Sequence, residues 1–260
     1  MATYTRYIAL GDSFTEGMCD EFVGSEYRGW ADRLADVMAS QTSGFTYANL
    51  AVRGKLIKQV MDDQIPLVAQ YVTGPETLIT FHAGANDVLR PNYKSEVALA
   101  QYRQAVQTLT ATGATVAVFT VIEAVDGKGK TADLWTARFS DFNVNVRAVA
   151  KEFGAILIEA QMAPWLADRR FLAVDRLHLN KEGHIRMANA LQELFDLPFD
   201  PAWRIPLPAA KKKSWLRKRY EGLRWLITFV IPWAWRRIRG RSSGDGRSPK
   251  FPVPVKWPIN

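Results

Sequence analysis

Ser13 is the residue of this chain whose setting best suits covalent chemistry. It stands in Gly11-Asp12-Ser13, directly after the apolar run of residues 7–10, and Gly17 follows four residues later. A serine in a tight turn after a buried strand is held on rigid backbone, which suits a nucleophile that attacks a carbonyl carbon. Asp and Ser are also common where a side chain caps a turn or a helix, so the tripeptide alone leaves both interpretations open.

Asp175 and His178 are the two groups that a serine nucleophile needs. They lie three residues apart in Asp-Arg-Leu-His, on a predicted loop before the last predicted helix. At this spacing the carboxylate can hold one imidazole nitrogen, and the other nitrogen can then take the proton of Ser13. Only a neutral imidazole can act in this way, so we expect activity to rise with pH.

The elements that must position these residues alternate between strands and helices. Near-continuous apolar strands predict a parallel sheet that is covered by helices on both faces. Since the carboxyl ends of parallel strands share one edge of the sheet, Ser13, Gly54 and Asn86 are expected to converge there, each after one of the first three strands. The predicted strands cover residues 7–10, 46–52, 77–82, 115–121 and 155–159, and the last predicted helix begins after Asn180.

Four blocks of the sequence resemble those of the SGNH (GDSL) hydrolase family. They are Gly-Asp-Ser-Phe-Thr-Glu-Gly at residues 11–17, Asn-Leu-Ala-Val-Arg-Gly at 49–54, Gly-Ala-Asn-Asp at 84–87 and Asp-Arg-Leu-His at 175–178. The resemblance covers residues 4–197, with Phe14 where the family's nickname has leucine. It implies a three-layer α/β/α sandwich with a five-stranded, mainly parallel sheet in a flavodoxin-like order. This hydrolase domain would span residues 1–202, followed by a basic helical extension over residues 203–260.

The resemblance also implies a role for each of five residues. Ser13 would be the nucleophile, His178 the base and Asp175 the group that orients the base. The N–H groups of Ser13 and Gly54 and the side-chain amide of Asn86 would stabilise the oxyanion that forms during attack. The implied reaction is hydrolysis of a carboxylic ester through an acyl-enzyme, without cofactor or metal. Apart from the resemblance, Gly54 suits the start of a helix and Asn86 suits a turn.

The substrate stays open at this point, because specificity lies in loops outside the four blocks. A short acyl ester, a lipid ester and an acetylated sugar are all compatible with the sequence. The alternative function is a non-catalytic lipid- or anion-binding module on the same scaffold. His82 and His184 are expected to be packed, and no His/Asp/Glu group has the spacing of a metal site. Arg53 suits both a position that faces the pocket and a solvated one.

Composition indicates a globular protein with a sizeable core. The 260 residues are 48% hydrophobic and 23% charged. Cys19 is the only cysteine, which excludes an intramolecular disulfide and a four-cysteine zinc site. We expect Cys19 to be a small, half-buried loop residue and not the nucleophile. The N-terminal residues run directly into the first strand without the pattern of a secretory signal, so we expect a cytoplasmic protein.

Charge is divided unequally along the chain. Residues 1–202 contain 19 Lys and Arg against 24 Asp and Glu, a net charge of −5. Residues 203–260 contain 15 Lys and Arg against two acidic residues, a net charge of +13, together with six of the nine tryptophans. Any anionic partner is therefore expected to bind the C-terminal extension.

The extension has the composition of a segment that lies in a membrane interface. Residues 211–241 alternate cations with Trp, and the apolar run of residues 225–235 is 11 residues long, too short to span a bilayer. We therefore expect association with an anionic membrane surface through residues 211–241. Packing of the extension over the enzyme and binding to an acidic protein are alternatives, and nucleic acid is disfavoured. Residues 242–260 are rich in Ser, Gly and Pro and are expected to be extended or loosely ordered.

Overall fold

A six-stranded sheet forms the centre of the computed structural model, which describes residues 3–123, 129–160, 164–210 and 214–258. Across the sheet the strands are β7 (Ile156–Ile158), β6 (Thr115–Phe119), β5 (Thr77–His82), β1 (Arg6–Gly11), β4 (Thr46–Asn49) and β8 (Phe251–Lys256). The first five are parallel to one another, and β8 is antiparallel to β4. The predicted α/β class and the flavodoxin-like order of the parallel strands are confirmed. The predicted count of five strands is wrong by one, because it omitted β8.

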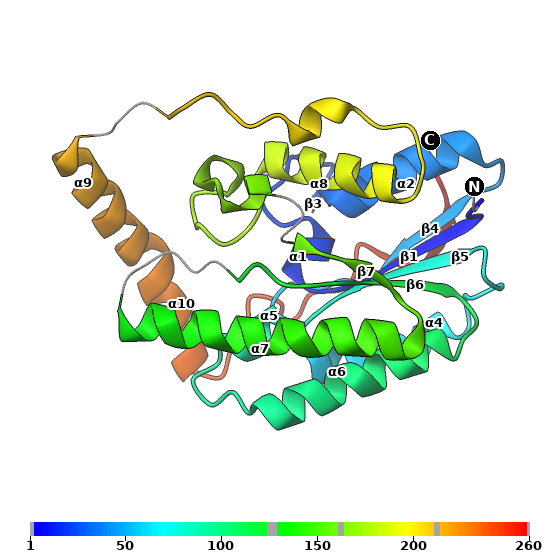
Figure 1. Ribbon diagram of the computed structural model, residues 1–260, viewed down its shortest axis with the longest axis horizontal. Helices are drawn as coiled ribbons and strands as arrows, with labels where there is room; N and C mark the ends of the chain where they lie inside the picture. The colour runs from blue at the N-terminus through cyan, green and yellow to red at the C-terminus, as the bar shows by residue number, and fades with distance from the viewer. Residues whose placement is uncertain (1–2, 124–128, 161–163, 211–213, 259–260) are drawn as a thin grey trace.

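Helices cover both faces of the sheet and complete the three layers (Figure 1). On one face lie α2 (Gly29–Gln41) and α8 (Lys181–Leu194), and on the other α3 (Ile57–Asp63), α6 (Ser95–Thr110) and α7 (Lys130–Phe153). All six residues of β5 are buried, as expected for a central parallel strand. The apolar side chains therefore form one core on each face of the sheet. Large members of the two cores are Trp30, Tyr7 and Tyr47 on the first face and Phe81, Tyr102 and Phe142 on the second.

Shorter elements connect the main ones. Asn180 caps α8, as predicted, because its side chain accepts a hydrogen bond from the N–H of Gly183 at 3.0 Å. The remaining short elements are α1 (Ser13–Glu16), α4 (Ile65–Val68), α5 (Ala85–Val88), the hairpin β2 (Phe22–Val23) and β3 (Glu26–Tyr27), and the 3₁₀ turns η2 (Pro164–Ala167), η3 (Arg169–Phe171) and η4 (Pro201–Arg204).

From residue 215 the C-terminal extension forms one continuous helical rod that lies beyond the carboxyl ends of the strands (Figure 1). It consists of α9 (Trp215–Trp225), the π turn η5 (Leu226–Val230) and α10 (Ile231–Ile238). The π turn precedes Pro232, which has no N–H to donate to the preceding turn. Residues 211–213, at the basic start of the expected interfacial segment, lie outside the described residues. None of the helices in the described part of the chain is long and apolar enough to cross a membrane.

After the rod, the extension returns to the sheet and supplies its edge strand. β8 pairs Val255 with Tyr47 and Lys256 with Thr46. Its two prolines, Pro252 and Pro254, are tolerated because an edge strand pairs on one side only. The rings of Phe251 and Trp257 lie 5.8 Å and 4.9 Å from that of Tyr47. Of the two expectations for residues 242–260, the extended one therefore holds for residues 251–256, and the loosely ordered one is wrong for them.

Lys250 joins the extension to the buried interior of residues 1–202. Its Nζ lies 2.7 Å from Asp32 Oδ2 and also donates to the carbonyl oxygens of Tyr27 and Arg28. The Tyr47 hydroxyl donates to Asp32 Oδ1 at 2.7 Å. Burial nevertheless raises the pKa of Asp32 to about 6, against the opposing effect of the Lys250 charge. Asp32 therefore depends on Lys250 to remain an anion at neutral pH.

Lys250→Met is expected to lower the free energy of unfolding by about 3 kcal/mol, because it leaves a buried carboxylate without its cation. Adding Asp32→Asn should recover part of this loss, since an amide oxygen can still accept from Tyr47. Burial raises the folded-state pKa of Asp32 above its unfolded value, so stability falls as pH rises between the two values. Urea denaturation should therefore show a smaller deficit at about pH 5 than at about pH 8. Equal stability of wild type and Lys250→Met at the higher pH would contradict this account.

Candidate active site

Ser13 lies at the carboxyl end of β1, the strand between β4 and β5 in the parallel set. Asp12 caps α1 by accepting a hydrogen bond from the N–H of Phe14 at 3.1 Å, which fixes the turn that carries Ser13. Gly11 has a φ of +138°, and a Cβ there would lie 2.1 Å from the carbonyl oxygen of His82. The turn therefore requires glycine at this position. The capping and nucleophile interpretations are compatible, because Asp12 provides the cap and Ser13 remains available.

His178 and Asp175 come to Ser13 from the loop before α8. His178 Nε2 lies 2.8 Å from Ser13 Oγ, and His178 Nδ1 lies 2.6 Å from Asp175 Oδ2. The other carboxylate oxygen accepts from the N–H groups of Leu177 and His178 at 3.0 and 3.1 Å. Burial alone would raise the pKa of Asp175, but His178 and these N–H groups hold that pKa below its ordinary value. An ionised carboxylate only accepts, so Nδ1 carries the imidazole proton and Nε2 faces the Ser13 hydroxyl as an acceptor.

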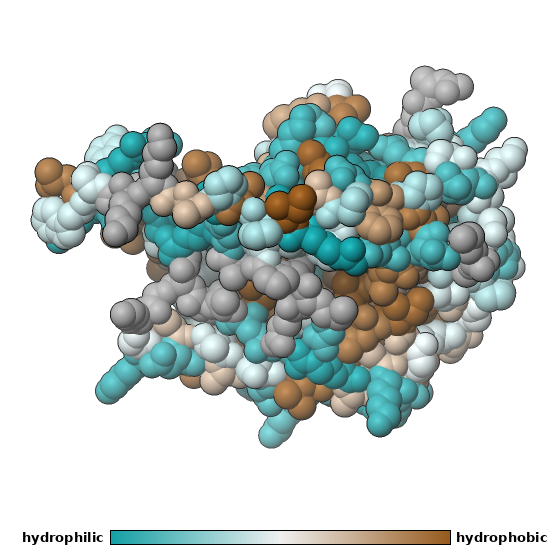
Figure 2. Space-filling model, turned by 45° about the horizontal axis from the view of Figure 1, so that its top comes forward, coloured by the Kyte–Doolittle hydropathy of each residue, from teal (hydrophilic) through white to brown (hydrophobic). Residues whose placement is uncertain are grey.

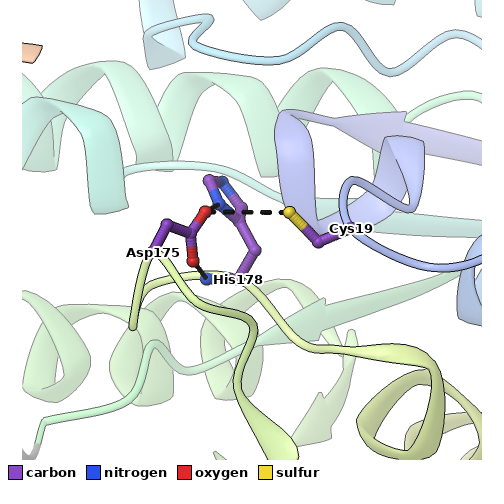
Figure 3. Close-up of side chains that lie close together, drawn as sticks. All are labelled: Cys19, Asp175 and His178. Atoms are coloured by element: carbon purple, nitrogen blue, oxygen red, sulfur yellow. Dashed lines mark hydrogen bonds and ion pairs between the residues drawn. The ribbon is translucent and has the colours of Figure 1, made fainter. Parts of the chain in front are cut away.

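Cys19 contacts the same oxygen of the Asp175 carboxylate as His178 Nδ1 does (Figure 3). Its Sγ donates to Asp175 Oδ2 over 3.7 Å. Burial and the Asp175 charge raise the pKa of Cys19 to about 12, so the residue is a neutral thiol and not a thiolate nucleophile. Among the described residues, Cys19, Asp175 and His178 are the one group of three that could hold a metal ion, with ligand atoms within 4.8 Å of one another. This group could not be predicted from the sequence, because Cys19 is 156 residues from Asp175.

Gly54 and Asn86 also lie at this edge of the sheet, after β4 and β5. The N–H groups of Ser13 and Gly54 donate to no acceptor among the described residues. Asn86 differs, because its amide Nδ2 already donates to Asp12 Oδ2 at 3.0 Å and to the carbonyl oxygen of Lys55 at 3.2 Å. To act on an oxyanion, Asn86 would have to share or release one of these bonds.

A buried ion pair ties the Gly54 turn to α1. Arg53 Nε donates to Glu16 Oε1 at 2.8 Å, Nη2 contacts the same oxygen, and the N–H of Arg53 donates to Glu16 Oε2 at 2.5 Å. The Arg53 guanidinium lies 5.3 Å from the centre of the Tyr27 ring. The interpretation of Arg53 as a solvated residue is therefore wrong. Glu16, which sequence reasoning did not single out, fixes the position of the residue directly before Gly54.

Asp87 is a second positioning group that sequence reasoning did not single out. Its Oδ2 accepts a hydrogen bond from the N–H of Ile57 at 3.1 Å, which attaches the start of α3 to the Gly-Ala-Asn-Asp block. Burial and the nearby Asp12 charge raise the pKa of Asp87 to about 7. The segment after Gly54 is thus held at one end by Glu16 and at the other by Asp87.

The two remaining histidines are packed, in line with expectation. His82 Nδ1 lies 3.4 Å from Asp12 Oδ1, and its ring stacks against Phe14 with the centres 4.5 Å apart. His184 accepts from the N–H of Trp30 at 3.2 Å, and its other ring nitrogen lies 3.2 Å from the carbonyl oxygen of Met18. Burial lowers the pKa of His184 to about 4, so its imidazole is neutral.

The C-terminal extension contacts the site at two points. The indole N–H of Trp225, in α9, donates to the carbonyl oxygen of Asp175 at 2.8 Å. On the other side, Ser242 Oγ donates to the carbonyl oxygen of Gly54 at 3.3 Å. Neither contact could be predicted from the sequence, since both join residues that are far apart along the chain. Residues 203–260 are therefore in contact with the loops that carry Asp175 and Gly54.

Comparisons with known proteins agree with this architecture. The model of the GDSL-like lipase/acylhydrolase family matches residues 9–186, whereas no curated protein matches the sequence. Among solved structures, the psychrotrophic esterase EstA from Pseudoalteromonas sp. is similar with a TM-score of 0.58 and 20% identity, over 74% of this chain and 97% of that chain. A lipolytic G-D-S-L family protein from Veillonella parvula DSM 2008 has a TM-score of 0.58 and 19% identity, over 74% and 98%. Axe2, an acetylxylan esterase from Geobacillus stearothermophilus, has a TM-score of 0.57 and 17% identity, over 74% and 95%.

Glu16→Gln is expected to lower kcat for ester hydrolysis by about ten- to a hundredfold, because the Gly54 N–H loses its fixed position. The matched control is Glu21→Gln, which removes a carboxylate that pairs with Arg33 and Lys181 at the surface. This control should keep kcat within about twofold of wild type. The measurement is kcat per folded molecule, below the melting temperature of every variant. A wild-type kcat for Glu16→Gln would show that Glu16 does not position the Gly54 turn.

Proposed function

We propose that Ser13 is the nucleophile of this chain, which belongs to the GDSL-like lipase/acylhydrolase family and is a carboxylic ester hydrolase. The observation that carries the proposal is the pair of hydrogen bonds that joins Ser13 Oγ, His178 and Asp175, at 2.8 and 2.6 Å. Nucleophile, base and orienting group within hydrogen-bond reach are what activation of a serine requires.

In the proposed first step, Ser13 Oγ attacks the ester carbonyl while His178 Nε2 takes the hydroxyl proton. The oxyanion that forms is stabilised by the N–H groups of Ser13 and Gly54, and by Asn86 once its amide turns from the carbonyl oxygen of Lys55. The protonated imidazole, held by Asp175, gives its proton to the leaving alcohol, and the acyl group stays on Ser13. A water molecule, deprotonated by the same imidazole, then releases the carboxylic acid and restores Ser13.

For the substrate, we favour an ester with an apolar portion over an acetylated sugar. The apolar side chains of Val174 and Leu177 are exposed on the loop that carries Asp175 and His178. Exposed apolar side chains beside a reactive group favour contact with an apolar group of the substrate. A short acyl ester and a lipid ester both meet this requirement. Axe2 is an acetylxylan esterase, but at 17% identity it shares only the fold with this chain. Its substrate is therefore not carried over to this chain.

Ser13→Ala is expected to reduce hydrolysis of p-nitrophenyl esters by at least about a thousandfold, because no other described nucleophile faces His178 Nε2. Ser40→Ala, which removes an exposed hydroxyl from α2, is the matched control and should keep full activity. Circular dichroism should show the same fold for both variants. Wild-type turnover by Ser13→Ala would reject the nucleophile. Absence of turnover by wild type on every ester would favour the non-catalytic binding module.

Asp175→Asn is expected to lower kcat by about 10⁴-fold, since an amide in place of the carboxylate favours the wrong imidazole tautomer. The control is Asp168→Asn, seven residues earlier, whose carboxylate pairs with Arg170 away from Ser13. Because the partners of Asp175 lower its pKa, the folded state gains stability from its ionised form, and that gain is lost as pH falls. The difference in unfolding free energy between wild type and Asp175→Asn should therefore shrink in acid. An Asp175→Asn kcat close to that of the control would remove Asp175 from the mechanism.

A further inference from the structure

The helical rod of residues 215–238 carries a stripe of large apolar side chains on its outer side. Seven residues form it, each between 54% and 79% exposed. Successive members are three or four positions apart, which is the spacing of one face of a helix. We call this set the apolar stripe: Leu216, Tyr220, Leu223, Ile227, Ile231, Trp235 and Ile238.

The π turn η5 keeps the stripe on one side of the rod. From Leu216 to Ile238 the mean spacing slightly exceeds 3.6 residues, so the face of an unbroken α-helix would drift around the axis. A π turn contains more residues per turn than an α-helix, and η5 lies at the middle of the rod, before Pro232. The stripe therefore stays on nearly the same face over the full length of the rod.

The inner side of the rod is anchored to the loop that carries the candidate active site. Trp225 is half-buried, and its indole N–H donates to the carbonyl oxygen of Asp175. The Arg176 guanidinium carbon lies 4.7 Å from the centre of the Trp225 ring. Arg176 Nη2 also donates to the carbonyl oxygen of Glu221 at 3.2 Å. These contacts attach one face of the rod to the body of the protein. The opposite face, which holds the apolar stripe, contacts no other described part of the chain closely enough to be buried.

Cations flank the apolar stripe. Residues 215–238 contain six Lys and Arg and one Glu, and by helical position the exposed Arg219 and Arg224 lie on the two sides of the stripe. At the left end of Figure 2, where α9 lies, hydrophobic and hydrophilic residues stand side by side on the surface. An exposed apolar stripe with cations on both sides matches the interface of an anionic bilayer, whose headgroups attract cations while its acyl region takes apolar side chains. Tyr220 and Trp235 are of the residue types that favour this depth.

We propose that the apolar stripe docks on the surface of an anionic lipid bilayer, with the rod lying in the plane of the interface. A second copy of the chain fits less well, because two rods of the same positive charge would repel each other. Nucleic acid also fits less well, because the middle of the stripe is aliphatic and offers no rings for base stacking. Docking would place the Asp175–His178 loop beside the bilayer through Trp225. That last consequence rests on the proposed function, whereas docking itself does not.

Co-sedimentation of the full chain with vesicles tests the docking. All proteins carry Ser13→Ala, so that hydrolysis cannot alter the lipids. The vesicles are pure phosphatidylcholine, or phosphatidylcholine and phosphatidylglycerol in equal amounts. The test variant is Leu223→Gln with Ile227→Gln, which keeps charge and helix propensity but removes two apolar groups of the stripe. The matched control is Val97→Gln with Val144→Gln, which removes two exposed apolar side chains from α6 and α7.

The parent protein should bind the phosphatidylglycerol vesicles and bind pure phosphatidylcholine more weakly. The stripe variant should bind the anionic vesicles about tenfold more weakly, and the control should bind like the parent. Arg219→Gln with Arg224→Gln should weaken binding by about fivefold per cation at low salt, with less loss at high salt. Absence of binding to anionic vesicles, or equal binding by the stripe variant and its control, would overturn the proposal. A dimer of the parent chain that the stripe variant abolishes would overturn it in favour of a second copy.

Discussion

The geometry of this site depends on one requirement, which is that a hydroxyl, an imidazole and a carboxylate meet although Ser13 and His178 are 165 residues apart. A parallel sheet meets it, because every strand delivers its next loop to the same edge. β1 lies between β4 and β5, so the Ser13 turn has neighbours on both sides, with Gly54 after β4 and Asn86 after β5. The last loop before α8 then adds His178 and Asp175 over this edge. The buried apolar cores on the two faces of the sheet supply the rigidity that holds these distances.

Buried charges near the site act mainly on backbone position. Glu16 takes hydrogen bonds from both the side chain and the N–H of Arg53, and Asp87 takes one from the N–H of Ile57. Between these two points lies the Gly54 turn, whose N–H is, in the proposed mechanism, aimed at an oxyanion that forms only during reaction. A buried carboxylate is costly unless it is paired, so these groups specify one backbone arrangement and exclude looser ones. Burial raises the pKa of Asp87 to about 7 because it disfavours the charged carboxylate.

Much of the fold and the placement of the five candidate residues could be predicted from the sequence, because both leave local marks. Apolar runs of strand length showed the parallel strands, and glycines and polar residues directly after them marked the functional edge. β8 was not predicted, because the two prolines of Phe-Pro-Val-Pro-Val-Lys are typical of a loop. Its pairing with β4 depends on the return of the chain to the sheet, which the local sequence does not indicate. The partners of Arg53, Cys19 and Asp175 could not be predicted for a similar reason. Each partner is distant in sequence, and the residue types alone do not show which residues pair.

The C-terminal extension links these parts, since Lys250 balances a buried carboxylate of α2 while Trp225 and Ser242 contact the two sides of the site. The central claim nevertheless concerns Ser13, and covalent labelling tests it most directly. The folded chain would be treated with a fluorophosphonate, which reacts with serines activated by a neighbouring base, and its peptides would be identified by mass spectrometry. The account predicts one adduct, on the peptide that contains Ser13, and none when His178 is replaced by Ala. An adduct on Cys19 or another serine, or no adduct on the folded wild-type chain, would contradict it.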